Sequence, residues 1–196
     1  KYDIKRIVDD NGVLAVWLEN EIVKFEKSNW EYSSVFFEKK IGDKNNGVAL
    51  TLQDEQLGEA HIKIHGKIDR VEIKKDAKSF LIADYKTSHK SVPSIKKIER
   101  GESLQIPIYL LALEEMYKDY NWVATAGVYY ILEKEVETNK ARKEFCFQDK
   151  YGPLLEASLK SAIKYKQSIE NRNFEANKCE RCNYCLLKTI CRVDKN

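Results

Sequence analysis

The sequence predicts an α/β fold, with a mixed central β-sheet flanked by α-helices. Two observations predict this fold. Helical patterns of apolar residues occur in three separate stretches, and short runs rich in β-branched and aromatic residues lie between them. The length of 196 residues suits one domain, large enough to bury a core without disulfides.

The N-terminal part is predicted to form one helix and two strands. Residues 13–25 carry apolar side chains at helical spacing after the start signal Asp10-Asn11-Gly12. Residues 33–41 and 47–52 are β-branched and aromatic runs bounded by Gly and Asn, which is typical of strands.

The stretch 61–73 is predicted as a strand with an irregularity. Ile64 and Ile68 share one parity along the strand, whereas Val71 and Ile73 take the other. The alternation therefore slips near Asp69. We expect a bulge or kink there that re-aims the Asp69 side chain, as bulges near active sites often do.

A second strand is predicted at 79–87, followed by a basic loop. Along this strand Phe80, Ile82, Asp84 and Lys86 share one face, because successive side chains alternate. The stretch 88–102 combines a proline and a glycine with several cationic residues, which indicates a loop.

The remaining elements are two helices and two strands. In the helix predicted at 103–118, Pro107 is tolerated because it falls in the first turn, where an amide has no intrahelical acceptor. Strands are predicted at 122–132 and 143–147, and an amphipathic helix at 152–169.

The chain is organised as a single domain. Its predicted parts are an N-terminal helical segment at 1–32, a sheet core with the active site at 33–150, a helix at 151–178 and a Cys-rich tail at 179–196.

Composition bounds the class of protein only loosely. With 34 Lys and Arg against 31 Asp and Glu, the net charge is +3, so a nucleic-acid binder would need a local basic surface. No apolar run approaches the roughly 20 residues that span a bilayer, and no signal peptide is visible. We expect a soluble, cytoplasmic protein without a membrane partner.

Asp84 and Lys86 are the first candidates for catalysis. Being two apart on a strand, their side chains leave the same face roughly 6 to 7 Å apart. Asp69 adds a second carboxylate if the two strands form an antiparallel pair. Two carboxylates commonly hold Mg²⁺, which polarises a scissile phosphate and activates water, while a lysine neutralises charge. The alternative is a solvated strand edge, the commoner meaning of a bare Asp-x-Lys.

Three motifs resemble those of PD-(D/E)XK nucleases of the RecB and AddB type. They are Gly-x-x-Asp-Arg at Gly66 to Arg70, Asp-Tyr-Lys-Thr at Asp84 to Thr87, and Gln-x-x-x-Tyr at Gln105 to Tyr109. The resemblance runs from about residue 38 to the C-terminus and implies a restriction-endonuclease-like core. It further implies a Mg²⁺-dependent or Mn²⁺-dependent deoxyribonuclease, an exonuclease of DNA repair and recombination.

The resemblance also implies a role for each motif residue. Asp69 and Asp84 would bind the metal, and Lys86 would be catalytic. Gln105 and Tyr109 would support the site and the DNA strand. Residues four apart share a helix face, so Gln105 and Tyr109 can project together; a polar rim on a core helix is the alternative. Glu38 ends a strand-like run and is a further acidic candidate, although a surface position is its commoner role.

Four of the five cysteines crowd into the tail. Cys179, Cys182, Cys185 and Cys191 are spaced C-x2-C-x2-C-x5-C, which can hold zinc or an iron-sulfur cluster; buried free cysteines are the alternative. AddB-type nucleases and related CRISPR-associated exonucleases resemble this tail, which implies a [4Fe-4S] cluster on Cys182, Cys185 and Cys191. Zn²⁺ is the alternative metal for these cysteines.

Two residues of these relatives are missing here. Their fourth cluster ligand precedes the nuclease motifs, where this chain has no cysteine, so Cys179 would substitute. Many also carry an early histidine, whereas the histidines here are His61, His65 and His89. We therefore expect the chain to be part of a longer protein, with a helicase subunit or an upstream helicase-like domain as its partner.

DNA is the expected substrate, and the local basic surface would come from the predicted loop. Its cations, with that of the neighbouring strand, are Lys86, Lys90, Lys96, Lys97 and Arg100. A flexible, soluble loop is the alternative. Two other functions stay open, a non-catalytic DNA-binding module on a nuclease scaffold and a redox or zinc protein centred on the cysteines.

Overall fold

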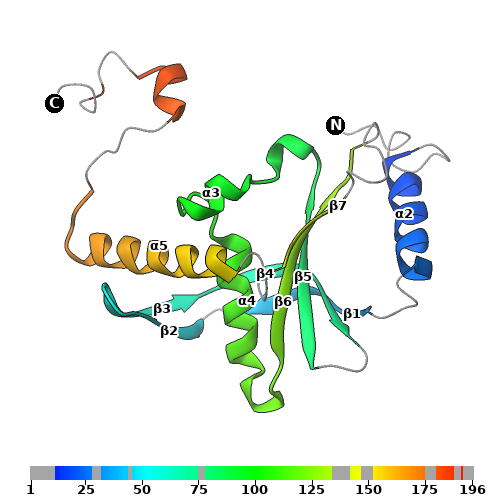
Figure 1. The fold of residues 1–196 in the computed structure, drawn as a ribbon, viewed down its shortest axis with the longest axis horizontal. Coiled ribbons are helices and arrows are strands. Elements are labelled where there is room, and N and C mark those ends of the chain that lie inside the picture. Colours follow the sequence, from blue (N-terminus) through cyan, green and yellow to red (C-terminus); the bar gives the residue numbers. More distant parts are fainter. Residues whose placement is uncertain are drawn as a thin grey trace.

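The computed structural model describes residues 12–27, 32–43, 46–74, 78–133, 142–146, 152–174, 180–187 and 191. Its centre is a five-stranded sheet in the order β1-β4-β5-β6-β7 (Figure 1). The strands are β1 (Tyr32–Ile41), β4 (Gly66–Lys74), β5 (Ser79–Lys86), β6 (Val123–Ile131) and β7 (Arg142–Cys146). The pair β5 and β6 is parallel and the other three pairs are antiparallel, so the sheet is mixed, as predicted.

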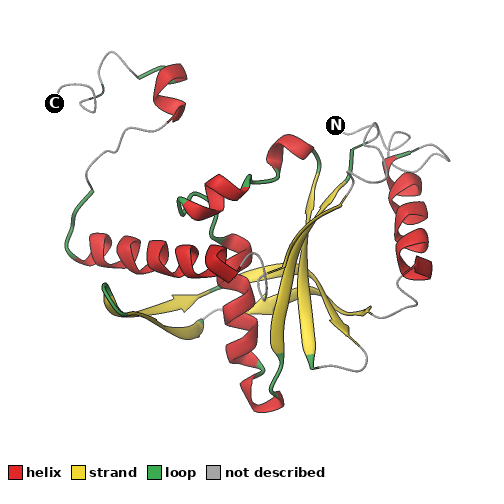
Figure 2. Cartoon of the chain, viewed as in Figure 1, coloured by secondary structure: helices red, strands yellow, loops and turns green. Residues whose placement is uncertain are grey.

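Helices cover both faces of this sheet. The helix α2 (Val13–Lys27) lies on one face, and α3 (Ile95–Glu99), α4 (Gln105–Met116) and α5 (Gly152–Glu170) lie toward the other (Figures 1 and 2). Short 3₁₀ turns are η1 (His89–Ser91), η2 (Lys118–Tyr120) and η3 (Glu180–Tyr184). The predicted α/β class is confirmed. None of the helices in the described residues is long and apolar enough to cross a membrane.

The central strand β5 is buried on both faces. Phe80 and Ile82 join the main core beneath α4, whereas Leu81 and Ala83 join a second cluster on the α2 side. This arrangement confirms the predicted face shared by Phe80, Ile82 and Asp84. A strand covered on both sides explains why the run before Asp84 is continuously apolar.

The stretch 61–73 forms two strands, where one was predicted. It divides at His65, since β3 (Gly58–Ile64) pairs with β2 (Val48–Asp54) in a separate two-stranded ribbon. Because the alternation of apolar residues continues from Ile64 to Ile68, hydrophobic periodicity alone could not reveal that one strand ends and another begins at His65.

The burial of β4 shows the slip in alternation near Asp69, but within the described strands the irregular backbone lies opposite Asp69 and not at it. Ile68 and Val71 have opposite strand parity and yet both lie in the main core. On the neighbouring strand, the register places Glu38 opposite Asp69, and Glu38 has a left-handed φ of 52°. The irregular backbone therefore belongs to β1, which also shifts register between Ser34 and Phe36.

The predicted loop 88–102 contains η1 and α3. The loop prediction was wrong because Ile95 and Ile98 are spaced as on a helix, and Ile98 is buried. Lys143 Nζ donates to the Pro93 carbonyl at 3.2 Å, and the Tyr165 hydroxyl donates to the Gly101 carbonyl at 3.4 Å. The basic segment is thus packed against the sheet and α5.

Candidate active site

The site lies where two neighbouring strands separate. The pairing of β4 with β5 ends at Arg70 and Ala83. Beyond that pair, β4 stays on β1 as far as Gly66, and β5 stays on β6 as far as Lys86. The register therefore leaves Asp69 and Asp84 facing each other just past the end of the ladder. Strands that part in this way leave room for side chains between them.

Asp69 takes over a hydrogen bond that strand pairing no longer provides. Its Oδ2 accepts from the backbone N–H of Tyr85 at 3.1 Å. The Asp69 carboxylate thus contacts β5 at Tyr85, the residue that follows Asp84. Because an unpaired buried amide is costly, this bond ties the position of Asp69 to the backbone of β5.

Asp84 is held from two sides. Only 8 % of the residue is exposed. Gln105, the first residue of α4, donates from Nε2 to Oδ1 at 3.0 Å, and Lys86 Nζ lies 2.6 Å from Oδ2. Oδ2 itself is buried and receives no hydrogen bond of good geometry. That oxygen therefore faces the Lys86 cation without a well-aligned hydrogen bond.

Tyr109 completes the wall of the hollow. One helical turn after Gln105, it lies directly over Gly66, the first residue of β4. The structure brings Asp69, Asp84, Gln105 and Tyr109 to one small hollow and sets Lys86 beside Asp84. The residues that line the hollow are Lys67, Ile68, Asp69, Ile82, Ala83, Asp84, Gln105, Ile106 and Tyr109. Glu38, the additional acidic candidate, forms an ion pair with Lys67.

Sequence reasoning missed Tyr129. This tyrosine of β6 pairs with Asp84 in the parallel register, and its ring centroid lies 5.6 Å from Lys86 Nζ. Burial raises the pKa of Tyr129, which is hydrogen-bonded to Ser103, and the charge of Asp84 adds to this rise. Its position depends on which strand lies next to β5, so no local motif signals it.

The opposite face of the same two strands holds a buried arginine. Arg70 is 3 % exposed, with Glu72 and Glu21 each 2.7 Å from its guanidinium. Burial by itself lowers the pKa of Arg70, but the charges of Glu72 and Glu21, with the hydroxyl of Tyr85, outweigh it and raise the pKa. Arg70 is therefore a permanent buried cation behind Asp69.

A known protein family matches nearly the whole chain. The family model of the PD-(D/E)XK nuclease superfamily matches residues 12–192. The chain belongs to this superfamily. A solved structure described as "Crystal structure of SSO0001" is 16 % identical with a TM-score of 0.38, covering 91 % of this chain and 68 % of that one. No curated protein matches the chain.

Membership in the PD-(D/E)XK superfamily indicates a nuclease, and such nucleases commonly use divalent metals such as Mg²⁺. The two carboxylates fit that ion. Mg²⁺ keeps much of its water shell and needs only one or two carboxylates from the protein. Asp69 and Asp84 both line one hollow, and the buried Oδ2 of Asp84 lies against the Lys86 ammonium without a well-aligned hydrogen bond.

The cysteine tail of this PD-(D/E)XK protein is described only in part. Cys179 lies outside the described residues, while Cys182 and Cys191 are half-buried and Cys185 is exposed. Within the described part of the chain, no three His, Cys, Asp or Glu side chains form a group that could hold a metal ion. The cluster therefore stays a prediction.

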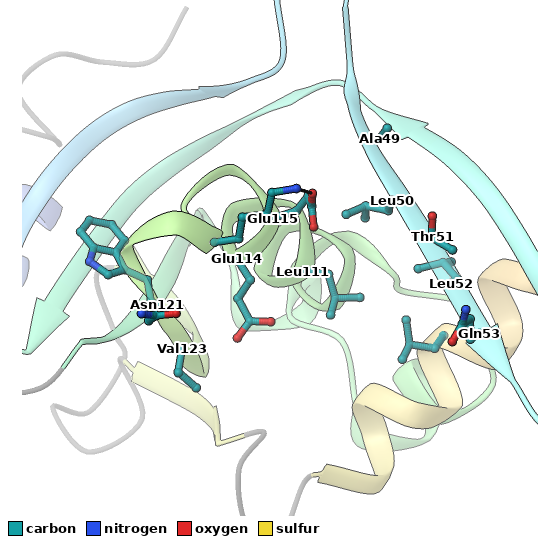
Figure 3. A pocket seen from close by; sticks show the side chains of 13 residues that line it. Ala49, Leu50, Thr51, Leu52, Gln53, Leu111, Glu114, Glu115, Asn121 and Val123 are labelled. Atoms are coloured by element: carbon teal, nitrogen blue, oxygen red, sulfur yellow. Dashed lines mark hydrogen bonds and ion pairs between the residues drawn. The ribbon is translucent and has the colours of Figure 1, made fainter.

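A larger cavity of about 570 Å³ lies away from these residues, between β2, α4 and α5. Figure 3 shows Leu111, Glu114 and Glu115 of α4 facing Leu50 and Leu52 of β2 across it. None of the superfamily's motif residues lines this cavity. Cavity size would thus point away from the motif residues.

Proposed function

We propose that this protein is a metal-dependent deoxyribonuclease with Asp69, Asp84 and Lys86 at its catalytic centre. The observation that carries the proposal is the separation of β4 from β5, which presents both carboxylates to one hollow. The ion pair of Lys86 with Asp84 and the superfamily match support it.

Each side chain has a role that its contacts support. Asp69 and Asp84 would hold Mg²⁺ or Mn²⁺ through carboxylate oxygens, and Gln105 fixes Asp84 through Oδ1. The metal, when bound, would supply Lewis-acid polarisation of the phosphate and a bound water of lowered pKa. Lys86 brings a positive charge to the same place, where it neutralises charge that develops on the phosphate or orients the attacking water.

The cations between β5 and α4 would bind the DNA backbone. Lys90, Lys96 and Arg100 are exposed, and their segment follows Lys86 directly. Because Ile98 and Pro93 anchor this segment, the charges are presented from a packed surface. Contacts of this kind position DNA without reading its sequence.

The test is DNA cleavage by purified protein with Mg²⁺ or Mn²⁺. We expect EDTA to abolish it and Asp84→Ala or Lys86→Ala to lower its rate about 10³-fold. Glu115, near the end of α4, forms an ion pair at 2.7 Å with Lys118 of η2, and these side chains are 42 % and 65 % exposed. Glu115→Ala and Lys118→Ala are therefore matched controls that should cleave normally.

Metal-dependent cleavage that persists in both site variants would sink the catalytic assignment. Wild-type protein that binds DNA but never cuts it would favour the non-catalytic DNA-binding module instead.

We further propose exonuclease action beside a helicase partner, on the strength of the RecB-type and AddB-type motifs. Linear DNA should then be degraded while covalently closed circles of the same sequence survive. Nicking of the circles would show endonuclease action.

The cysteine tail is proposed to bind a [4Fe-4S] cluster, which gives a brown protein with broad visible absorption when purified without oxygen. A colourless protein with stoichiometric zinc would support the alternative site. Protein with neither metal would contradict both.

A further inference from the structure

The residue after each proposed metal ligand points away from the hollow. Arg70 follows Asp69 and Tyr85 follows Asp84, and strand alternation turns both toward α2. Tyr85 stacks on Tyr130 with ring centroids 5.6 Å apart and meets Trp17 of α2 edge-on at 5.8 Å. The face of these strands opposite the hollow is therefore packed beneath α2.

Two links cross between β4 and β5 beyond the end of their ladder, and both pass through Tyr85. On the α2 side, the Arg70 guanidinium donates from Nη1 to the Tyr85 hydroxyl at 3.3 Å. On the hollow side, the Tyr85 N–H donates to Asp69 at 3.1 Å. The distance between Asp69 and β5 therefore depends on where Tyr85 is held.

Arg70 is in turn held by acids from two elements. Its Nη2 lies 2.7 Å from Glu72 Oε1 on the same strand, and its Nη1 lies 2.7 Å from Glu21 Oε2 on α2. The side chains of Glu21 and Glu72 are 8 % and 0 % exposed, so water screens these contacts little. A planar guanidinium can meet Glu21, Glu72 and Tyr85 together, which a lysine could not.

We propose that Arg70 and Tyr85 are positioning residues for the two carboxylates, and that α2 contributes Glu21 to hold them. This inference rests on the proposed metal-dependent nuclease. No described residue of α2 lines the hollow, so the helix would act on metal affinity only through Arg70 and Tyr85. The site thereby depends on a segment nearly fifty residues upstream of Asp69 (Glu21 to Asp69 in the chain).

The variants Tyr85→Phe and Glu21→Gln test this with little change in volume. The first removes only the hydroxyl and keeps the ring packed on Tyr130 and Trp17. The second removes only the charge. Glu19→Gln is the matched control, because Glu19 lies on the same helix and is exposed. Asp84→Ala reports the loss of a direct ligand.

The measurement is Mn²⁺ affinity of the full chain by isothermal titration calorimetry, together with Tm without metal. We expect Tyr85→Phe and Glu21→Gln to bind Mn²⁺ about 10-fold more weakly, as removal of supporting groups around a metal typically does. Glu19→Gln should bind like the wild type. Cleavage by both variants should recover when Mn²⁺ is raised to saturation.

Unchanged Mn²⁺ affinity in both variants would overturn the inference, and a lower Tm with unchanged affinity would assign these residues to the fold alone. Wild-type protein that binds no Mn²⁺, or Asp84→Ala that binds it normally, would instead overturn the proposed metal site and the inference with it.

Discussion

A side chain on Gly66 would place its Cβ atom 2.3 Å from the hydroxyl oxygen of Tyr109. The glycine of the first motif and the tyrosine of the third are therefore in direct contact, although 43 positions separate residues 66 and 109. Gly66 does not have a positive φ, so the close approach of Tyr109 is the reason that glycine is needed there.

Gly66→Ala should therefore displace Tyr109 from the wall of the hollow. We expect a loss of stability of about 1 to 3 kcal/mol, as for other overpacked sites, and a lower cleavage rate. Urea unfolding and initial rates measure the two effects. In a Tyr109→Ala background the added methyl has room, so most of this cost should vanish in a double-mutant cycle. Strictly additive effects would show that another interaction is responsible.

Tyr129 should matter to the rate because its ring faces the Lys86 ammonium. Tyr129 also packs edge-on against Phe145, with ring centroids 6.0 Å apart. Tyr129→Leu and Phe145→Leu should lose similar stability, about 1 to 3 kcal/mol each, since both remove a buried ring. Tyr129→Leu should lose about 10-fold more activity, which corresponds to a cation–π interaction of about 1 to 2 kcal/mol.

Tyr129→Phe keeps the ring and should restore most of that activity. Initial rates across pH measure the effect on activity, and Tm measures the effect on folding. Equal losses of activity in Tyr129→Leu and Phe145→Leu would remove any special role for this ring.

Glu114 should make stability depend on pH. Burial raises the pKa of this carboxyl, although the N–H of Ala124 donates to it at 2.6 Å. The folded state therefore binds the proton more tightly than the unfolded state. The stabilisation from this group is complete at pH below the unfolded value of about 4.3 and is lost as pH rises through the higher folded pKa.

Glu114→Gln cannot ionise. The difference in Tm between this variant and the wild type should therefore shift in favour of the variant as pH rises from about 4. Thermal unfolding across this range is the measurement. Tm curves that stay parallel in the two proteins would contradict the assignment.

The packed basic segment predicts a salt dependence of DNA binding. Lys96→Gln together with Arg100→Gln should weaken binding and lower the slope of log K against log salt by about 0.9 for each phosphate that the protein no longer neutralises. Lys164→Gln on α5 is the control, since Lys164 is exposed on another element. Fluorescence anisotropy without divalent metal measures this. A slope that is unchanged in the double variant would place the DNA elsewhere.

Local patterns predicted the elements of the site well. Strand parity was sufficient to put Asp84 and Lys86 on the face of Phe80, and Pro107 was sufficient to locate the first turn of α4. Both depend on residues a few positions apart. The motifs themselves pointed to Asp69, Gln105 and Tyr109, which the structure gathers at one hollow.

The features that prediction missed depend on neighbours distant in the chain. The break at His65 exists because Ile62 pairs with Leu50 in another sheet. Tyr129 approaches Lys86 only because β6 lies beside β5 after a crossover of more than thirty residues (87–122). Hydrophobic periodicity holds no information on either, since it gives the faces of a strand and not the identity of its neighbours.

Asp69 accepts a hydrogen bond from the Tyr85 amide, and as a proposed metal ligand it would also supply negative charge. Asparagine has a carbonyl oxygen that can still accept from the amide, but it carries no charge to hold a cation. Asp69→Asn would therefore keep the hydrogen bond from Tyr85 and the shape of the hollow, but it would lose the negative charge that could hold a metal ion. Such an inert form is the one in which an uncut substrate could be captured and seen.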